Sequence, residues 1–566
     1  MLKNYPRPQL RRNSFINLNG EWSFSVMEDK GPETKIGTIC VPYAPEAPLS
    51  GIGRTFANNS LMHYSRSFSL PEGFNKGRVL LHFGAVDQQA QVYVNGVSAG
   101  SHTGGYEHFF FDITAFLKDE NTIDVYASDD LDSLKLPYGK QKHDRGGIWY
   151  TPTSGIWQTV WLESVPEVYI EELKIAASGN RVTVEAVGAD EGTVTVSPAK
   201  IYGKDGEKGA SFTEKLSCGK AEFTVNEPAF WSPEEPWLYD FTVEAGEDRA
   251  ESYFGLRDIA AGEAGGHPRI LLNGAPYYFH GLLDQGYWPD GGLTPPSDEA
   301  YEFDILAMKS LGYDTLRKHI KQEPEQFYYD CDRLGMAVFQ DMVNNGKVKH
   351  FWDGVMATVG LKRRSDRMLH PDRETRKAFL QNMEQEVKAL KNHPCICYWT
   401  IFNEGWGQFC STDAYELMRL LDDTRIIDSA SGWYKGGKTE VVSEHIYFRP
   451  VKLKAADKPL ILSEFGGYVY KPEGHVFNED REYGYRYYKE REAYEEAVLK
   501  LYEDEIIPAV EEAGLDCDIY TQVSDVEDEL NGYLSYDRQV LKVSPEPMRA
   551  MALRLKEAFA RSCEGK

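Results

Sequence analysis

The sequence contains few of the features that mark disulfide-bonded or membrane-spanning proteins. It has 8 cysteines in 566 residues, and they lack the spacing of a disulfide framework. No apolar run reaches the roughly 18 residues that a membrane-spanning helix needs, and the first residues include no apolar segment of signal-peptide length. We therefore expect a cytoplasmic protein with reduced thiols and no membrane partner.

Basic residues are scarce relative to acidic ones. The chain has 62 Lys and Arg against 88 Asp and Glu, which gives a net charge of −26. Proteins that bind nucleic acid concentrate Lys and Arg on one face, so no nucleic-acid partner is expected. The acidic excess itself predicts self-repulsion and identifies no partner.

Metal and phosphate motifs are also missing from the sequence. The histidines show no HxH or HExxH spacing, and there is no glycine-rich phosphate loop of the Walker type. Cys395 and Cys397 lie inside a predicted buried strand, where small thiols pack as apolar groups. No metal and no cofactor are expected.

Aromatic residues, by contrast, are plentiful, with 34 Tyr and 11 Trp. Such rings stack on flat apolar ligands, sugars included, and they also fill protein cores. A chain of 566 residues exceeds what one hydrophobic core supports, so two to four domains are expected.

The first region, residues 1–165, shows strands and turns without a helical period. "RVLLHFGAV" and "AQVYVNGVSAG" are short apolar runs, and Asn95-Gly96 predicts a two-residue hairpin turn. "GIWQTVWLE" supplies a closing strand. This pattern predicts an N-terminal jelly-roll-like β-sandwich.

The second region, residues 166–258, has tighter and more regular spacing. "RVTVEAV" alternates Val182, Val184 and Ala186 with polar residues, and "GTVTVSP" repeats the pattern. An immunoglobulin-like β-sandwich is expected here.

The third region, residues 259–566, changes to a helical period. "DEAYEFDILAMKSLG" predicts a helix that buries a stripe with Phe303, Leu306 and Leu311 and ends at Gly312. Eight strand candidates begin near Tyr277, Tyr313, Met336, Cys395, Ile426, Val441, Pro459 and Cys517. Strands that alternate with helices in this way predict a C-terminal (β/α)8 TIM barrel.

Reactive side chains of such a barrel lie at the carboxyl ends of its strands. Two predicted strands stop abruptly at a carboxylate, "WTIFNE" at Glu404 and "PLILSE" at Glu464. Further polar residues at strand ends are Asp284, Arg317, His319, Asp341 and Asp525. Each strand-end Glu alone could be a member of a structural ion pair, but two facing one another predict catalysis.

Glycosidases use a facing pair of carboxylates for catalysis. Separations of about 5–5.5 Å accompany retention and about 6.5–9.5 Å inversion, and the sequence leaves this gap open. Asn403 could bond a sugar hydroxyl, Tyr447 could orient the nucleophile, and Trp406 offers a ring for binding.

Several segments resemble glycoside hydrolase family 2. "SFINLNGEWSF" and "TSGIWQTVWLE" resemble parts of the sugar-binding domain of that family, and "WTIFNE" and "ILSEFGG" resemble its acid/base and nucleophile motifs. The order of sandwich, immunoglobulin-like domain and barrel is also that of the family. The resemblance covers nearly the whole chain.

The resemblance implies that Glu404 is the general acid/base and Glu464 the nucleophile of a retaining exo-β-glycosidase. It implies that Asn403 contacts the sugar 2-hydroxyl and that Arg317 supports the nucleophile. His319 would touch the substrate, and Tyr447 would lie near the nucleophile. A non-catalytic carbohydrate-binding protein, which would not need both Glu residues, is the alternative from another class.

The family includes β-galactosidases, β-glucuronidases and β-mannosidases, so the sugar needs further argument. Where β-glucuronidases carry an Asn-x-Lys motif, this chain has Asn531, Gly532 and Tyr533, without the lysine. Acidic Asp284 and Asp525 at the mouth would repel a charged sugar. We expect a neutral pyranoside, a β-galactoside first, with β-glucuronides, β-galacturonides and α-L-arabinosides as alternatives.

Loops supply the remaining expectations. "GKQKHDRGG" in the sandwich could reach the barrel mouth and bring Trp149 and Tyr150 to the substrate. Residues 344–370 and 468–490 are long enough to act as lids or to mediate assembly, and a homo-oligomer is possible.

Overall fold

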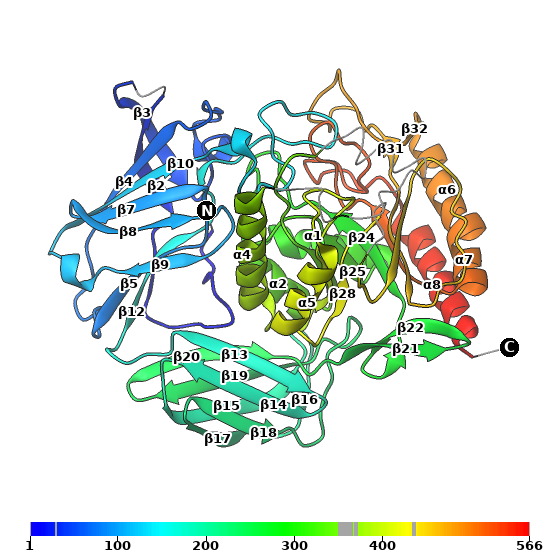
Figure 1. Cartoon of the computed structure of the whole chain (residues 1–566), viewed down its shortest axis with the longest axis horizontal. Coiled ribbons are helices and arrows are strands. Elements are labelled where there is room, and N and C mark those ends of the chain that lie inside the picture. Colours follow the sequence, from blue (N-terminus) through cyan, green and yellow to red (C-terminus); the bar gives the residue numbers. More distant parts are fainter. Residues whose placement is uncertain (1, 29–30, 349–365, 367–371, 433–436, 565–566) are drawn as a thin grey trace.

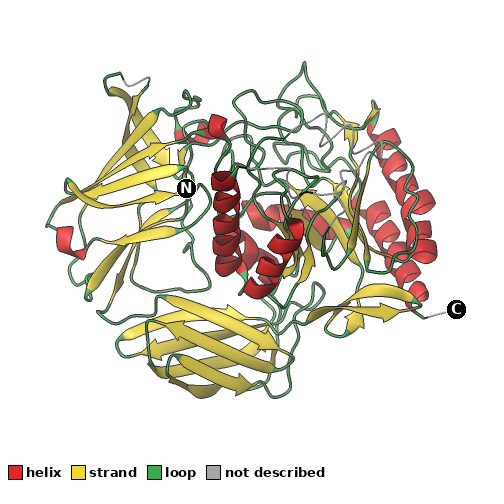
Figure 2. Cartoon of the chain, in the orientation of Figure 1, coloured by secondary structure: helices red, strands yellow, loops and turns green. Residues whose placement is uncertain are grey.

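Two all-β regions and one region of alternating strands and helices follow each other along the chain (Figure 1). The computed structural model describes residues 2–28, 31–348, 366, 372–432 and 437–564. Strands make up both β regions, and helices lie around the strands of the third (Figure 2). The order expected from the sequence, two β-sandwiches followed by a (β/α)8 barrel, is therefore present.

The first region is a sandwich of two antiparallel sheets. The four-stranded sheet has the order β1 (Phe15–Asn17), β12 (Val160–Val165), β5 (Arg78–Phe83), β9 (Phe109–Asp112). The six-stranded sheet has the order β3 (Thr34–Val41), β2 (Gly20–Met27), β4 (Leu61–Phe68), β10 (Asn121–Ser128), β7 (Gln89–Val94), β8 (Val97–Thr103). Short elements complete it: η1 (Pro48–Ser50), β6 (Val86–Asp87), η2 (Thr114–Phe116), η3 (Leu131–Ser133) and β11 (Gly155–Ile156).

The predicted hairpin turn of this sandwich is confirmed. Val94 pairs with Val97 across the turn, and Asn95 and Gly96 have φ values of 53° and 78°. Two successive left-handed residues match the twist of the flanking strands, and Asn-Gly adopts them with little steric cost.

The second region is a smaller sandwich of antiparallel strands below the first in Figure 1. Val182, Val184 and Ala186 are buried, as their alternation predicts. Its strands are β13 (Glu172–Ser178), β14 (Arg181–Val187), β15 (Glu191–Lys200), β16 (Glu207–Lys208), β17 (Phe212–Ser217), β18 (Lys220–Thr224), β19 (Leu238–Ala245) and β20 (Asp248–Phe254).

A three-stranded sheet precedes the barrel, a feature that the sequence pattern did not predict. It consists of β21 (Ile259–Ala264), β22 (His267–Leu272) and β23 (Ala275–Pro276). Arg269 of β22 donates to Ser562 near the chain end, at 2.7 Å, so this sheet joins the last helix to the rest of the barrel.

The barrel has eight parallel strands, and each of the eight expected strands is present. Their paired order is β28 (Ile426–Asp428), β27 (Ile396–Thr400), β26 (Ala337–Asp341), β25 (Thr315–Lys318), β24 (Phe279–Asp284), β33 (Leu515–Thr521), β30 (Leu460–Gly466), β29 (Val442–Ile446). In the described residues, consecutive strands of the barrel pair with each other except β28 and β29, and the first and last strands, β24 and β33, also pair.

Helices and short elements connect these strands. They are α1 (Ala300–Leu311), α2 (Glu325–Leu334), α4 (Arg373–Leu390), α5 (Ser411–Leu421), β31 (Tyr468–Tyr470), β32 (Arg486–Tyr488), α6 (Arg491–Leu501), η5 (Tyr502–Ile506), α7 (Ile507–Ala513) and α8 (Pro545–Cys563). None of the helices in the described ranges is long and apolar enough to cross a membrane.

The predicted buried stripe of α1 is wrong in part. Phe303 and Leu306 are 49% and 45% exposed, whereas Ile305 and Met308 are fully buried. The helix therefore packs on the barrel through the neighbouring face, which carries Ile305 and Met308. Gly312 ends the helix at φ 101°, as predicted.

Candidate active site

The two strand-end Glu residues meet at the carboxyl ends of the barrel strands. Glu464 lies within β30, and Glu404 follows β27. One carboxylate oxygen from each, together with Nδ1 of His445, forms a group in which every pair of atoms is within 4.8 Å. The two carboxylates therefore face a common space.

Glu464 is held by a donor at each oxygen. Arg317 Nη1 donates to its Oε1 at 2.9 Å, and the Tyr447 hydroxyl donates to its Oε2 at 2.6 Å. Only 4% of Glu464 is exposed. The carboxylate is consequently fixed in one orientation, as a nucleophile requires.

Arg317 connects several groups of the site. It bonds Asp341 through Nε at 3.0 Å and Nη2 at 2.9 Å, and Nη2 also donates to Asn403 Oδ1 at 2.9 Å. Burial by itself would lower the pKa of Arg317, but the charges of Asp341 and Glu464 raise it overall. Arg317 thus remains a cation between these groups.

Glu404 has a different environment from Glu464. Its side chain is 15% exposed against 5% for Glu464, and its Oε1 lies 2.8 Å from His445 Nδ1. Its backbone is left-handed, with φ 51°. A non-glycine residue in this region is sterically unfavourable and often marks a functional position.

His445 bridges the pair, because Nδ1 is also 3.5 Å from Glu464 Oε2. No role was expected for His445 from the sequence, although it lies in the predicted strand that begins near Val441. Its position near the end of this strand, β29 in the structure, is the sequence signal that could have identified it as a site residue.

His319 and Asn403 lie beside the carboxylates. His319 Nε2 is 3.5 Å from Glu464 Oε1. The pKa of His319 is lowered by burial and then by the positive charges of Lys140, Arg317 and His445, so its ring stays neutral. Asn403 accepts through Oδ1, which leaves its amide N–H groups as the donors toward a ligand.

Asp284 and Asp525 do not form the acidic mouth that the sequence suggested. Lys318 Nζ donates to Asp284 Oδ2 and Lys542 Nζ to Asp525 Oδ1, each at 2.6 Å. Burial raises the pKa of Asp525 to about 6, against the pull of Lys542. Both carboxylates are buried members of ion pairs, and so the repulsion expected for a charged sugar is removed.

Trp149 and Trp406 meet each other rather than an open cleft. Their rings stack with centroids 5.2 Å apart, in a buried cluster that includes Tyr138. The Tyr138 N–H donates to the Asn344 carbonyl at 3.0 Å. The sandwich loop therefore reaches the barrel as predicted, and its tryptophan fastens it there.

Lys140 and Glu529 are residues that the sequence analysis missed. The Tyr150 hydroxyl donates to Glu529 Oε2 at 2.5 Å, and Lys140 Nζ lies 3.8 Å from the same oxygen. The charge of Lys140 contributes to the lowered pKa of His319. The preceding residue, Gly139, lies against the chain next to His319, since a Cβ there would be 3.0 Å from the Ile320 carbonyl oxygen. No sequence signal distinguishes Lys140, because its surroundings come from another domain.

An aromatic rim borders the nucleophile. The Tyr485 ring stacks on Tyr447 with centroids 3.9 Å apart, and Phe448 meets Tyr485 edge-on at 5.2 Å. Phe448 is 74% exposed. The loop 468–490 thus contributes Tyr485 to the mouth, whereas residues 349–365 and 367–370 of the other predicted lid lie outside the described residues.

The Glu404–His445–Glu464 group is also, across the described ranges, the one set of three acidic or His donors with the spread of a cation site. Both oxygens of Glu464 already accept hydrogen bonds, and Arg317 supplies the positive charge. This donor set fits a catalytic carboxylate pair better than a metal centre.

Comparison with known protein families identifies all three regions. Residues 50–166 match "Glycosyl hydrolases family 2, sugar binding domain", residues 168–257 match "Glycosyl hydrolases family 2", and residues 267–542 match "Glycosyl hydrolases family 2, TIM barrel domain".

Similar sequences carry several activities. A β-galactosidase of Thermoanaerobacter pseudethanolicus is 24% identical over 522 residues, which cover 83% of this chain and 65% of that protein. A β-glucuronidase of Streptococcus agalactiae is 23% identical, with 82% and 84% covered. This chain therefore spans less than two thirds of the length of the β-galactosidase.

Solved structures share the fold over almost the whole chain. The β-D-glucuronidase of Dictyoglomus thermophilum has a TM-score of 0.72 at 18% identity, covering 98% of this chain and 99% of that one. The β-galacturonidase of Eisenbergiella tayi bound to galacturonate has a TM-score of 0.66 at 20% identity, with 98% and 99% covered. Together with the three successive family matches, these comparisons show that the chain belongs to glycosyl hydrolases family 2.

Proposed function

We propose that the protein is a retaining exo-β-glycosidase that hydrolyses terminal sugars with Glu464 as nucleophile and Glu404 as acid/base. The closeness of the two carboxylates carries this proposal. Their nearest oxygens lie within 4.8 Å. That closeness suits the separation of about 5–5.5 Å in retaining enzymes rather than the about 6.5–9.5 Å that leaves room for a water in inverting ones.

In the first step, Glu464 attacks the anomeric carbon and Glu404 gives its proton to the glycosidic oxygen, whose bond to that carbon breaks. The aglycone leaves as an alcohol, and the sugar is esterified to Glu464. In the second step, Glu404 removes a proton from water while the water oxygen attacks the same carbon. The sugar is released with its original configuration, and both carboxyl groups return to their starting states.

The surrounding residues suit these steps. Arg317 and Tyr447 point positive charge and a hydroxyl donor at Glu464, and both can strengthen their bonds as the carboxylate is released. His445 lies within 3.5 Å of both Glu residues and could assist the proton changes at Glu404. Neutral His319 offers an uncharged ring to the sugar.

For the glycone, we propose a neutral β-galactoside, because the lysine of the uronide motif is missing at Tyr533. A β-uronide is the second candidate, and Lys140 is the observation that favours it. This buried cation lies near His319, and Asp284 and Asp525 are no longer arguments against a carboxylate. The names of the relatives include both types of sugar.

A panel of nitrophenyl glycosides tests the proposal. It contains β-galactoside, β-glucoside, β-mannoside, β-glucuronide and β-galacturonide, with Glu464→Gln as the blank and proton NMR of the first-formed anomer. We expect one β-glycoside to be hydrolysed with retention, and the signal to vanish in the blank. Hydrolysis with inversion, or activity that survives in Glu464→Gln, would refute the mechanism.

A further inference from the structure

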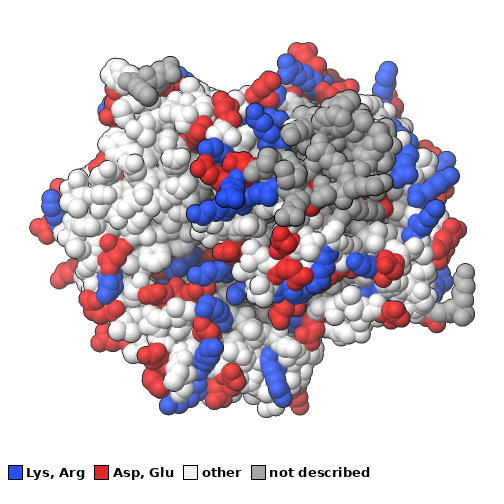
Figure 3. Space-filling model, in the orientation of Figure 1, with Lys and Arg blue, Asp and Glu red and all other residues white. Residues whose placement is uncertain are grey.

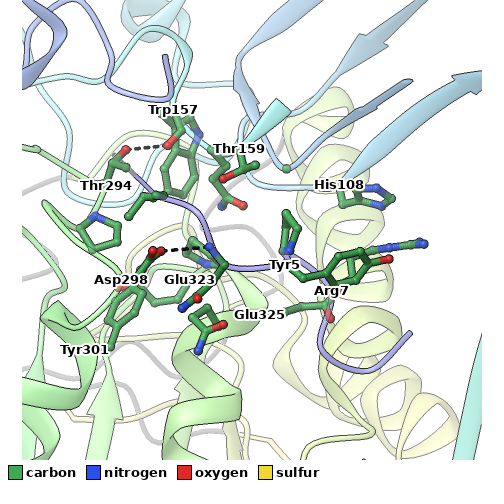
Figure 4. A pocket seen from close by; sticks show the side chains of 18 of the residues that line it. Tyr5, Arg7, His108, Trp157, Thr159, Thr294, Asp298, Tyr301, Glu323 and Glu325 are labelled. Carbon is green, nitrogen blue, oxygen red and sulfur yellow. Dashed lines mark hydrogen bonds between the residues drawn. The ribbon is translucent and has the colours of Figure 1, made fainter. Parts of the chain in front are cut away.

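A second pocket lies between the first sandwich and the barrel, away from the two Glu residues (Figure 4). The empty space between its lining residues, with open solvent at its entrance included, is about 810 Å³. Tyr5 of the N-terminal segment, Trp157 of the sandwich and Tyr301 of α1 supply ring walls from three separate parts of the chain. Ring walls with a few polar groups between them are typical of small-molecule sites.

Three of the charged groups that line this pocket have partners in the structure. Arg7 pairs with Glu163 at 3.2 Å, and the Asp298 carboxylate accepts the Lys3 N–H at 2.9 Å. Glu323 accepts from Lys318. Arg7 and Glu323 therefore add little unbalanced charge for a ligand to meet, whereas the partner of Asp298 is a neutral backbone N–H.

The polar groups that remain are neutral. Gln158, Thr159 and Gln326 lie in the lining. Gln322 also lines the pocket, is only 6% exposed, and its Oε1 has no hydrogen-bond partner among the described residues. An unpaired buried amide oxygen is costly, so it marks a place where a donor from outside the chain would be accepted.

The pKa values of two titratable groups in the lining are shifted. Burial raises the pKa of Glu325. Burial and the charge of Arg7 lower the pKa of His108. Rings, amides and hydroxyls without net charge match the apolar faces and hydroxyl groups of a sugar.

We propose that this pocket is a second binding site for a neutral monosaccharide, with Gln322 as a ligand-contacting residue. The choice of a sugar rests on the proposed glycosidase function, because the reaction would release such a molecule close by. Glycone and second-site ligand would then be of the same chemical class.

The pocket is connected to the catalytic residues by one short stretch of chain. His319, beside Glu464, is followed by Ile320, Lys321, Gln322 and Glu323. Glu323 Oε1 accepts from Lys318 and from Lys321, each at 2.8 Å, and these bonds stiffen the stretch. A ligand on Gln322 is therefore expected to shift His319, and product inhibition should have a non-competitive component.

The test counts sites with the catalytic site blocked. The enzyme is inactivated with a 2-deoxy-2-fluoro-β-glycosyl fluoride of the preferred sugar, which leaves the sugar covalently on Glu464. Galactose, glucose, mannose and glucuronate are then titrated by calorimetry. We expect saturable binding of at least one neutral sugar, with one equivalent bound, and no binding of glucuronate at this site.

Two variants assign that binding to the pocket. Gln322→Ala should weaken it at least about tenfold, which corresponds to about 1.4 kcal/mol, in the range of one lost buried hydrogen bond. Ser297→Trp, which fills the pocket from its edge, should abolish it. Gln539→Ala, at an exposed amide elsewhere on the barrel, should leave it unchanged.

The possible failures are distinguishable. If the inactivator does not label the enzyme, the proposed mechanism fails, and the pocket is tested by comparing unmodified enzyme with Gln322→Ala and Ser297→Trp. No neutral sugar bound to the labelled enzyme, binding of glucuronate alone, or binding unchanged in both variants would overturn the second site.

Discussion

Two groups of buried carboxylates in this protein differ in whether a cation lies beside them. At the barrel mouth, Glu464 and Asp341 share the guanidinium of Arg317. In the first sandwich, Asp87 and Asp129 are buried, and across the described ranges no Lys or Arg forms an ion pair with them. The acidic and basic side chains on the face seen in Figure 3 are, by comparison, intermixed.

The pKa values in the sandwich follow from this difference. Burial raises the pKa of Glu46 to about 8 and that of Asp129 to about 7, and burial and the charge of Asp129 raise the pKa of Asp87. Acids without a cation can become neutral at little cost to the fold. A nucleophile cannot, and so Arg317 lies beside Glu464 at the mouth, whereas Asp87 and Asp129 of the sandwich have no such partner among the described residues.

The largest expected effect is at the nucleophile. Glu464→Gln removes the attacking oxygen but keeps the shape, so kcat should fall by about 1,000-fold or more while the melting temperature changes little. The measurement is hydrolysis of the preferred nitrophenyl glycoside. Glu473→Gln, an exposed residue on the loop after β30, should retain full activity. A near wild-type rate in Glu464→Gln would contradict the role of Glu464 as the nucleophile, and with it the contrast between the mouth and the sandwich.

Glu404 should show its role through the leaving group. In Glu404→Ala, glycosides with poor leaving groups should lose about 100- to 10,000-fold in kcat/KM, because they need protonation. Nitrophenyl glycosides with good leaving groups should lose far less in this first step. A linear free-energy series over substituted phenols measures the difference. Equal losses across the series would exclude the acid role.

Arg317 should matter for stability as well as for activity. Arg317→Met leaves Glu464 and Asp341 buried without a cation, and the free energy of unfolding should fall by about 3–5 kcal/mol. Urea unfolding checks this. Arg249→Met removes an exposed pair with Glu244, and its effect should be about 1 kcal/mol or less. Similar losses in both variants would remove the distinction between the two kinds of ion pair.

The smallest effect is expected in the sandwich, and it depends on pH. In the unfolded chain these carboxyls titrate near pH 4, so between about pH 4 and 8 the native state holds more protons than the unfolded state. The stability they contribute is present below pH 4 and is lost as pH rises through the folded values of about 7 and 8. High pH should therefore destabilise this sandwich.

Glu46→Gln and Asp129→Asn should cancel that loss. At pH 8.5 each should raise the free energy of unfolding by roughly 1–3 kcal/mol, and the gain should shrink towards pH 5.5. Unfolding at both pH values is the measurement, with exposed Asp119→Asn as a control that changes neither. A gain that did not depend on pH would show that these acids are not titrating.

Local pattern was enough for much of the fold. The eight strands of the barrel were predicted because most of them are short segments rich in apolar residues that alternate with helical segments. Glu404 and Glu464 were found because a carboxylate that ends such a run is visible in a few letters of sequence. The alternation of Val182 and Val184 and the Asn95-Gly96 turn are equally local.

The errors and omissions share one cause, which is contact between distant parts of the chain. The face of α1 was misjudged because its partners, not its own pattern, decide which apolar residues are buried. Lys318 and Lys542 neutralise Asp284 and Asp525, and no spacing rule connects these pairs. Lys140 reaches the barrel from another domain.

The sequence by itself determined which side chains could react, because strand patterns and motifs are local properties of the chain. Only the tertiary structure decided how those side chains work together. It brought the oxygens of Glu404 and Glu464 within 4.8 Å and put Arg317 between the buried acids of the mouth, and among the described residues it placed no Lys or Arg in an ion pair with Asp87 or Asp129. Coulombic and hydrogen-bond energies depend on distances in space, and folding alone sets these distances.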